Sequence, residues 1–509
     1  MKISLGLGFV ASVSLLACGT TEEDPTGARI RIAHLSPDAP AVDVCIARAG
    51  SDAWSGPVLA NAGAAAGLSY GSVTKYLDVE ATQYDVRIVA PGAANCDQAV
   101  GGLADITDLP VLPAGASATI SAIGRLDSST SQPFRLAAFI DDTEVTFGKA
   151  KLRVIHAAPG TAGVAVGFGG GVVFDPFIDN VQFGSTTQAN NGYFEVAPIA
   201  GGEITARDIV SGTDAISIKP VVVPAGAIVT AFAIGTAGNA ASPLDVLLCV
   251  DNAPDEGLLS SCKRAGSAPE RARLRIAHLS PDAPIVDVCL APAGTESWRG
   301  PLLRGLGATG VAYSQVTTYI DVPTGAYDVR VITATSTSCA AGAVPDTKNV
   351  ATTAGLTATV AAIGILDPQG AAASNPTFRL ALFPDDTTTV ANKTKLRFVH
   401  ASPGTPAVDV GLGVAHAFAR VFANVSFGES GGGFVTTEPF STAVTARLAN
   451  AATDALSVPG VTAAGGSIYS AYAIGGKTGS PTNPLRVLLC QDSQAPAAGS
   501  ILTPCVVAP

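Results

Sequence analysis

Apolar and polar residues alternate with a period of two over many short stretches of the chain. Ile30, Ile32 and His34 fall on one face of such a stretch, whereas Arg31 and Ala33 fall on the other. Similar runs cover 42–47, 70–79, 84–88, 106–112, 117–123 and 134–140. Turns rich in Gly, Pro and Asp separate the runs, and no long amphipathic helical pattern appears. About seven strands predict an antiparallel β-sandwich of the immunoglobulin-like or transthyretin-like kind, with a closed barrel as the alternative.

This pattern occurs four times. Each repeat begins with Arg-x-x-His, and the four histidines are spaced 122 residues apart, at His34, His156, His278 and His400. A period this long indicates a string of domains rather than a solenoid, whose repeats are shorter. We therefore predict four tandem β-sandwiches, over residues 29–145, 150–264, 272–390 and 394–509.

The repeats alternate in kind. The first and third share Ser-Pro-Asp-Ala-Pro after the histidine (36–40 and 280–284) and Trp-x-Gly-Pro (54–57 and 298–301). The second and fourth share Val-Leu-Leu-Cys (246–249 and 487–490). This alternation indicates that a unit of two repeats has been duplicated.

The composition narrows the class of protein. Apolar residues make up 47% of the chain and charged residues 14%, which is typical of a folded chain rather than a disordered one. The formal net charge is −11, and no cluster of Lys and Arg appears. A nucleic-acid partner is therefore not expected.

The N-terminus has the features of an export signal. Lys2 precedes an apolar stretch over 3–17, which ends in Leu-Leu-Ala-Cys at Cys18. This motif resembles the lipobox of bacterial lipoproteins, in which the cysteine is acylated and becomes the mature N-terminus. We predict a signal peptide over 1–17 and an acylated Cys18 (palmitate among its acyl chains) that begins a flexible tether over 18–28. Anchoring in the cell envelope follows, at the outer membrane or cell surface. A plain secretory signal with a chance cysteine is the alternative.

The other eight cysteines recur at matching places in the repeats, which favours disulfides in an exported protein. The expected bridges would each close inside one repeat, so that every sandwich would be an independently stapled unit. Metal thiolates are the alternative, but no Cys-x-x-Cys motif occurs. The expected pairs are Cys45–Cys96, Cys249–Cys262, Cys289–Cys339 and Cys490–Cys505.

The segment Arg-Ile-Ala-His-Leu-Ser-Pro-Asp-Ala-Pro-x-Val-Asp-Val, at 31–44 and 275–288, resembles the signature of a bacterial family of extracytoplasmic repeats. That family is known only as a domain of unknown function. The second repeat departs from the signature, with Ala165 in place of its second Asp, whereas the fourth keeps Asp409. The resemblance implies exported β-sandwiches, often lipid-anchored, and implies no activity.

The histidine of each repeat is a candidate for catalysis, because Ser36 and Asp38 follow His34 closely. A hydrolytic triad needs a nucleophile bonded to the histidine and a third group that orients it. However, His34 shares the core-facing side of its strand with Ile30 and Ile32, and the second repeat lacks both Ser and Asp. A buried histidine that bonds the following turn is the favoured interpretation, and no catalysis is expected.

The signature arginines lie on the opposite side of their strand from the histidines. We therefore expect them to face outward and to pair, on the surface, with the signature aspartates of the neighbouring strand. The second repeat has Arg153 but no such aspartate. The expected pairs are Arg31 with Asp43, Arg275 with Asp287, and Arg397 with Asp409.

Two other sets of residues are candidates for binding. Carboxylates between tandem sandwiches can hold Ca²⁺, although a solvated turn is the favoured interpretation of Asp141, Asp142, Asp385 and Asp386. No other cofactor is expected. The two tryptophans, Trp54 and Trp298, could stack on a sugar or anchor a partner. A ring packed over one end of the sandwich beside a disulfide is favoured for them.

Three classes of function are consistent with these sequence features. The first is a membrane-anchored envelope protein with a structural, adhesive or display role towards an unknown partner. The second is a lipoprotein that binds a glycan or another polymer through its loops. The third, a hydrolase, is the least favoured, whereas repetition adds reach or avidity to the first two.

Overall fold

The computed structural model describes residues 27–508, except 108, 128–130, 188, 254–257, 261, 368–374 and 477–482. The predicted signal peptide, Cys18 and nearly all of the tether lie outside these residues. Within them the protein consists of tandem all-β regions with only short helices, as predicted. No helix in the described part of the chain is long and apolar enough to cross a membrane.

The chain divides into two compact units. Unit 1 comprises residues up to 163 together with 181–200 and 222–265, and unit 2 comprises 164–180, 201–221 and 266–509. The second repeat contributes one sheet to each unit. The two units therefore do not follow the limits of the four predicted sandwiches, and those limits stay a prediction.

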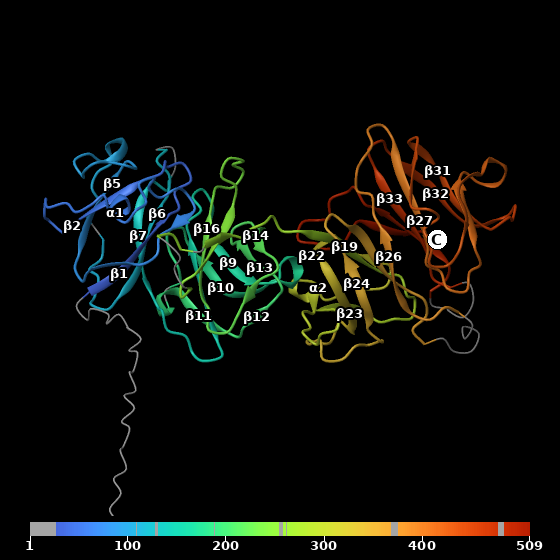
Figure 1. Ribbon diagram of the computed structural model, residues 1–509. Coiled ribbons are helices and arrows are strands. Elements are labelled where there is room, and N and C mark those ends of the chain that lie inside the picture. The colour runs from blue at the N-terminus through green and yellow to red at the C-terminus, as the bar shows by residue number, and fades with distance from the viewer. Residues whose placement is uncertain are drawn as a thin grey trace, which may run out of the picture. The chain divides into compact units, whose positions relative to one another are not determined.

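In unit 1 the first repeat forms two sheets, drawn in blue in Figure 1. One has the order β3-β1-β6-β7, with β4 also paired to β1, and the other is the pair β2-β5. The elements are β1 (Gly27–His34), β2 (Asp43–Arg48), α1 (Val58–Asn61), β3 (Ser72–Val73), β4 (Leu77–Glu80), β5 (Tyr84–Val89), η1 (Val100–Gly102), β6 (Ser117–Ile123) and β7 (Arg135–Asp141).

Unit 1 also contains a sheet of the second repeat, with the order β11-β8-β16-β17-β18, and the short pair β12-β15. Its elements are β8 (Ala150–His156), η3 (Ala189–Gly192), β11 (Tyr193–Val196), β12 (Ile199–Ala200), β15 (Val222–Val223), β16 (Ile228–Ile234), β17 (Asp245–Val250) and β18 (Cys262–Arg264). The other sheet of this repeat, β10-β9-β13-β14, belongs to unit 2. It is built from β9 (Val164–Phe168), η2 (Gly171–Val173), β10 (Asp175–Val181), β13 (Ile204–Asp208) and β14 (Asp214–Ile218).

The third repeat lies in unit 2. Its sheets are β21-β19-β25-β26, with β22 also paired to β19, and β20-β23-β24. The elements are β19 (Arg271–His278), β20 (Val286–Pro292), α2 (Leu302–Gly305), β21 (Gln315–Val316), β22 (Ile320–Pro323), β23 (Gly325–Thr333), β24 (Thr347–Thr352), β25 (Thr357–Ile363) and β26 (Arg379–Pro384).

The fourth repeat also lies in unit 2, with the sheets β30-β27-β33-β34-β35 and β29-β28-β31-β32. Its elements are β27 (Thr394–His400), β28 (Val408–Leu412), η5 (Ala415–Ala417), β29 (Ala419–Val425), β30 (Phe434–Thr437), β31 (Phe440–Leu448), β32 (Asp454–Ala463), β33 (Ile468–Ile474), β34 (Arg486–Gln491) and β35 (Cys505–Ala508).

The first strand of each repeat runs parallel to one neighbour. β1 pairs in parallel with β6, and the same holds for β8 with β16, β19 with β25, and β27 with β33. The prediction of purely antiparallel sheets was therefore wrong at this pair. Parallel neighbours need a long connection, and the elements between β1 and β6, which include both strands of the opposing sheet, β2 and β5, supply it. Among the described residues of the predicted strand over 106–112, Ile106 makes an isolated bridge to Val86, whereas the third repeat forms β24 at the matching place.

Each sandwich core is built by the alternation seen in the sequence. In the first repeat, Ile30, Ile32 and Ile120 of one sheet pack against Val44 and Ile88 of the other. Corresponding aliphatic clusters fill the third and fourth repeats. Each fully buried side chain of this kind contributes about 1.5–3 kcal/mol, so these clusters hold the opposing sheets together.

Candidate functional site

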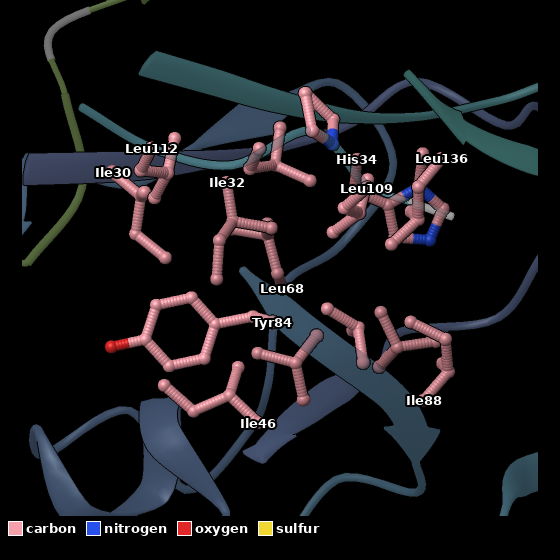
Figure 2. Close-up of a pocket in the computed structure, with 16 residues that line it drawn as sticks. Ile30, Ile32, His34, Ile46, Leu68, Tyr84, Ile88, Leu109, Leu112 and Leu136 are labelled. Carbon is pink, nitrogen blue, oxygen red and sulfur yellow. The ribbon is translucent and has the colours of Figure 1, made fainter. Parts of the chain in front are cut away.

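The interior of the first repeat contains an apolar cavity of about 40 Å³. Figure 2 shows Ile30 and Ile32 on one side of it and Ile46 and Tyr84 on the other. The third repeat has a similar cavity of about 50 Å³, and the fourth a larger one of about 180 Å³. Aliphatic and aromatic side chains line most of all three, each with a single polar residue (His34, Thr352 or Thr405), and no acid, base and nucleophile converge there. These cavities are gaps in packing rather than reaction sites.

The signature histidines hold the turn that follows them. The Nε2–H group of His34 donates a hydrogen bond to the carbonyl oxygen of Pro40 at 2.8 Å, and the ring packs edge-on against Tyr70. Burial lowers the pKa of all four imidazoles, so they are kept neutral. The prediction of buried, turn-bonding histidines is confirmed. The other bonds run from His156 to Ala162 (2.9 Å), from His278 to Pro284 (2.8 Å) and from His400 to Pro406 (3.1 Å).

The two residues that suggested a triad bond the turn to the segment that follows β6. The hydroxyl of Ser36 donates to the carbonyl oxygen of Gly124 at 2.7 Å. Asp38 accepts from the backbone N–H groups of Leu126 and Asp127 at 3.0 and 3.1 Å. Ser36 therefore donates its proton away from His34, and the arrangement lacks the bonded chain that a triad requires.

The signature arginines are buried, not exposed, so the outward-facing prediction was wrong. Arg31 is 1% exposed, and the other three, Arg153, Arg275 and Arg397, are fully buried. The outer face of each of these sheets is covered by the matching face of the neighbouring repeat within the same unit. In unit 1, Ala33, Leu35 and Phe139 pack against Ile155 and Phe232. An equivalent cluster joins the third and fourth repeats.

The signature aspartates do not pair with these arginines, because they lie on the opposite sheet of the sandwich. Asp43 accepts from the backbone N–H groups of Leu59 and Ala60, both at 2.8 Å, at the start of α1. A carboxylate is favoured there because those amides have no partner inside the helix. Asp287 holds α2 in the same way. Asp409 instead binds the N–H of Asn424 and the side chain of Arg420.

Between the first two repeats lies a layer of buried ion pairs, which we call the unit 1 arginine layer. Arg31 binds Asp251 at 2.8 Å, and Arg153 binds Asp141 at 2.6 Å, so each pair crosses from one repeat to the other. Thr119 accepts from Arg31 and donates to Asp141. Burial opposes the charge on Arg31, but Asp251 and Asp141 beside it raise the pKa of that guanidinium above its ordinary value. Two cations and two anions make the layer neutral.

Unit 2 repeats this arrangement as the unit 2 arginine layer. Arg275 binds Asp492 at 2.7 Å and Arg397 binds Asp385 at 2.5 Å, again across two repeats. Thr359 bridges Arg275 and Asp385 as Thr119 does in unit 1. Removing one partner from such a layer leaves a buried charge without compensation, which costs about 3–5 kcal/mol.

All four predicted disulfides are confirmed. They join Cys45 to Cys96, Cys249 to Cys262, Cys289 to Cys339, and Cys490 to Cys505. The expectation that each repeat is an independent unit is wrong, however. The first and second repeats share a buried layer and an apolar cluster, as do the third and fourth, so the bridged repeats are packed in pairs.

The aspartates that suggested a calcium site are held by cations of the protein itself. Asp141 and Asp385 are buried members of the arginine layers. Asp142 binds Lys151, and Asp386 binds Lys395. The hydrogen bond from Lys395 lowers the pKa of Asp386 to about 2. These ammonium and guanidinium groups take the places that a calcium ion would need. In the part of the chain that the structure describes, no cluster of three or more His, Cys, Asp or Glu could hold a metal ion.

Both tryptophans pack beside a disulfide, as the favoured interpretation expected. Trp54 contacts the Cys45–Cys96 pair, and the guanidinium of Arg87 lies 4.1 Å from the centre of its ring. Arg87 is fixed by Asp105 and by the carbonyl oxygen of Cys96. Trp298 and Arg330 repeat the arrangement at 3.8 Å. A sugar could stack on these rings only by displacing an arginine that is already well bonded.

A second kind of joint lies inside unit 2, between the η2 turn and the third repeat. Arg271 binds Asp214 at 2.6 Å and Glu203 at 2.8 Å. A Cβ atom on Gly171 would lie 2.2 Å from the carbonyl oxygen of Asp321, so only glycine permits this approach. The matching turn of the fourth repeat carries the exposed residue Ala415 instead, so it could not approach a neighbour in this way.

Sequence reasoning missed the carboxylates and hydroxyls that complete the arginine layers. Asp251 and Asp492 each follow a disulfide cysteine by two residues, and Thr119 and Thr359 recur in matching strands. Four arginines on the outer face of four apolar strands were a signal that this face is buried. Without a partner surface in view, the alternation alone assigned that face to solvent.

Comparison with known proteins is sparse. No curated protein matches the chain. Among solved structures, the Bacillus anthracis TIE protein matches with 9% identity over 88% of this chain and 68% of that chain, at a TM-score of 0.12.

The family comparison is positive. A model described as a domain of unknown function, DUF4397, matches residues 28–167 and 272–411. These regions contain the first and third repeats and continue into the opening strands of the second and fourth. Together they make up more than half of the chain. The chain therefore belongs to the DUF4397 family.

Proposed function

We propose that this protein is a lipid-anchored structural or display protein of the bacterial cell envelope, without catalytic activity. The observation that carries the proposal is the use of the family signature. Its arginines, histidines and aspartates make internal bonds that hold turns, helices and joints between repeats. A catalytic site would need such groups to be free to meet a substrate.

Location outside the cytoplasm is supported by the four disulfides, because such bonds persist in oxidising compartments. Anchoring is a further step, which depends on Cys18 and its lipobox. A chain held by several acyl groups would remain at a membrane, so the repeats would be presented from its surface.

The anchoring is tested by replacing Cys18 with Ser and labelling cells with an alkyne-bearing fatty acid. The unaltered protein should carry the label and partition into detergent, whereas C18S should lose both properties. A matched control is Thr20→Ser, two residues further on, which should keep the label. Equal labelling of C18S, or an unlabelled parent protein, would contradict the anchor.

The structural role is tested by the cooperativity between paired repeats. Arg153→Met should speed amide hydrogen exchange in β1 and β6 of the first repeat as well as in β8, because the layer is shared. Val44→Ala, which alters only the interior of the first repeat, is the control and should leave β8 nearly unchanged. An effect of Arg153→Met confined to the second repeat would show that the repeats behave as separate modules.

The alternative role, binding of a glycan or another polymer through the tryptophan loops, has less support. Arg87 and Arg330 cover the rings of Trp54 and Trp298. A glycan array probed with the full chain and with a Trp54→Ala/Trp298→Ala variant separates the two roles. Binding that disappears in the variant would favour the alternative, and its absence in both would favour the structural role.

A further inference from the structure

Two of the four disulfides close a loop that crosses from one repeat to the next. In unit 1 the loop between Cys249 and Cys262 includes residues 258–260, which we call strap 1. Leu258 accepts a backbone hydrogen bond from Lys75 at 2.7 Å, and Ser260 donates one to Val73 at 2.9 Å. Strap 1 therefore extends the edge of the first repeat's sheet at β3.

Side chains strengthen this contact. The hydroxyl of Ser260 donates to the carbonyl oxygen of Thr74 at 2.7 Å. The side chain of Leu258 packs against the hydrophobic core of the first repeat. Strap 1 thus covers part of the core of a repeat to which it does not belong in sequence.

Unit 2 has the same device. Residues 501–503, which we call strap 2, lie in the loop closed by Cys490 and Cys505. Ile501 accepts from the N–H of Thr318 at 2.6 Å, and Thr503 donates to Val316 at 2.8 Å. The side chain of Ile501 packs against the core of the third repeat. Because the arrangement occurs in both units, it is a property of the paired repeats rather than of one loop.

Each of these loops also supplies a carboxylate to an arginine layer. Asp251 lies two residues after Cys249 and binds Arg31 at 2.8 Å. Asp492 lies two residues after Cys490 and binds Arg275 at 2.7 Å. The disulfide therefore fixes both ends of the joint, the strap at the sheet edge and the carboxylate in the buried layer.

The two kinds of disulfide differ in accessibility. Cys45 and Cys96 are both buried, and Trp54 packs against them. Cys262 is only half-buried, and it lies on β18 at the edge of its sheet, directly opposite Cys249. Cys505 has the same position on β35. An external thiol therefore reaches Cys262 and Cys505 more easily than the cysteines beside the tryptophans.

We propose that Cys249–Cys262 and Cys490–Cys505 are sites of thiol–disulfide exchange with an extracytoplasmic dithiol, and that their reduction opens the joints between paired repeats. The first thiolate of the dithiol attacks Sγ of Cys262, and the electron pair of the broken S–S bond goes to Sγ of Cys249, which takes up a proton. The second thiol then attacks the mixed disulfide and releases Cys262, so two electrons pass from the dithiol to the cystine.

Reduction frees strap 1 to leave β3, and Asp251 loses the constraint that holds it against Arg31. The first repeat then exposes a strand edge and part of its core, while the disulfide beside Trp54 stays intact. Opening of the joints by reduction is independent of the proposed display role, because it does not depend on what the protein displays.

The test is amide hydrogen exchange of the full-length chain with and without dithiothreitol, with alkylation of the freed thiols. After reduction, the alkylating agent should label four cysteines first, namely Cys249, Cys262, Cys490 and Cys505. Reduction should speed exchange at Lys75 and Thr318 by at least about tenfold, while β6 and β25 keep their protection. Unchanged protection at these amides in a fully reduced chain, or equal loss throughout β6 and β25, would overturn the proposal.

Variants distinguish opening of the joint between repeats from a general destabilisation of the chain. Cys249→Ser/Cys262→Ser should show fast exchange at Lys75 without any reductant, and Cys45→Ser/Cys96→Ser should leave that amide protected. Ser260→Pro, which removes the two hydrogen bonds that Ser260 donates to Val73 and Thr74 but keeps the disulfide, should also speed exchange at Lys75. If the Cys45/Cys96 variant exposed Lys75 as much as the Cys249/Cys262 variant did, the assignment would be wrong.

Discussion

The two arginine layers have the same charges but different hydroxyl groups. In unit 1, Tyr193 of β11 donates to Asp251 at 2.9 Å, and Phe232 lies on β16, on the other side of β8. In unit 2 the matching positions hold Phe434 and Tyr472. The hydroxyl of Tyr472 accepts from Arg397 at 3.2 Å, while the ring of Phe434 lies beneath the same guanidinium.

The difference shows which part of a buried layer is fixed. Every arginine and aspartate of one layer has its equivalent in the other, because a buried charge without a partner costs several kcal/mol. The tyrosine hydroxyl, whose hydrogen bond to a charged partner contributes about 1.5–3 kcal/mol, has moved from the strand of Tyr193 to that of Tyr472, because losing it leaves no charge without a counter-charge. Hence the ion pairs are common to both arginine layers, whereas the position of the tyrosine hydroxyl differs between them.

The largest expected effect comes from removing one charge. Arg153→Met should leave Asp141 buried without its main partner and lower the free energy of unfolding by about 3–5 kcal/mol. Arg397→Met should do the same to Asp385 in unit 2. Urea denaturation measures both. Arg48→Met, which breaks the exposed pair with Glu80, is the control and should change stability by less than about 1 kcal/mol. A loss below about 1 kcal/mol in both layers would refute the comparison.

A smaller effect is expected when both partners are replaced. Arg31→Met combined with Asp251→Leu should cost less than either single change, because neither partner is left charged in an apolar layer. A double-mutant cycle in urea measures the coupling. Strict additivity of the two changes would mean that Arg31 and Asp251 do not act as a pair.

Exchanging the hydroxyls sharpens the comparison further. Tyr193→Phe should destabilise unit 1 by about 1.5–3 kcal/mol, as should Tyr472→Phe in unit 2, because each hydroxyl bonds a charged group. Adding Phe232→Tyr to Tyr193→Phe gives unit 1 the arrangement of unit 2 and should restore most of the loss. Thermal unfolding measures the three variants, and a double variant less stable than Tyr193→Phe would show that the layers are not interchangeable.

The smallest effect concerns the pH dependence of stability, in which the two units should behave alike. Burial lowers the pKa of the signature histidines below the ordinary 6.5, so the unfolded chain binds more protons than the folded chain in the window below 6.5. Stability should thus be constant above this pH and fall as the pH drops through it. His34→Asn should reduce the slope in unfolding experiments between pH 7 and 5.

At lower pH both units gain a second contribution, because the pKa of Asp142 beside Lys151 is lowered in spite of burial, and that of Asp386 beside Lys395 is lowered as well. Lys395 lowers the pKa of Asp386 to about 2, from an ordinary 3.8. The stability from this pair is therefore fully present above pH 3.8 and is lost as the pH falls towards 2. Asp386→Asn should remove this part of the acid dependence, and an unchanged acid profile would contradict it.

The sequence by itself determined the all-β class, the repeat, the four disulfides and the buried state of the signature histidines. Each depends on local information. Alternation reports which face of a strand is apolar, a fixed period reports a repeated unit, and matching cysteines report bridges inside it. The turn that His34 bonds lies only six residues away, at Pro40, so its role could be inferred from nearby residues.

The tertiary structure decided the role of the other face of those strands. Arg31 looks like a surface residue in its own strand, and only the second repeat, with Asp251 at a distance of 220 residues, makes its environment a buried one. The parallel pairing of β1 with β6 and the docking of strap 1 on β3 are likewise decided far away in sequence. Alternation tells the two faces of a strand apart, but whether a polar face meets water or a complementary charged surface depends on which other sheet covers it.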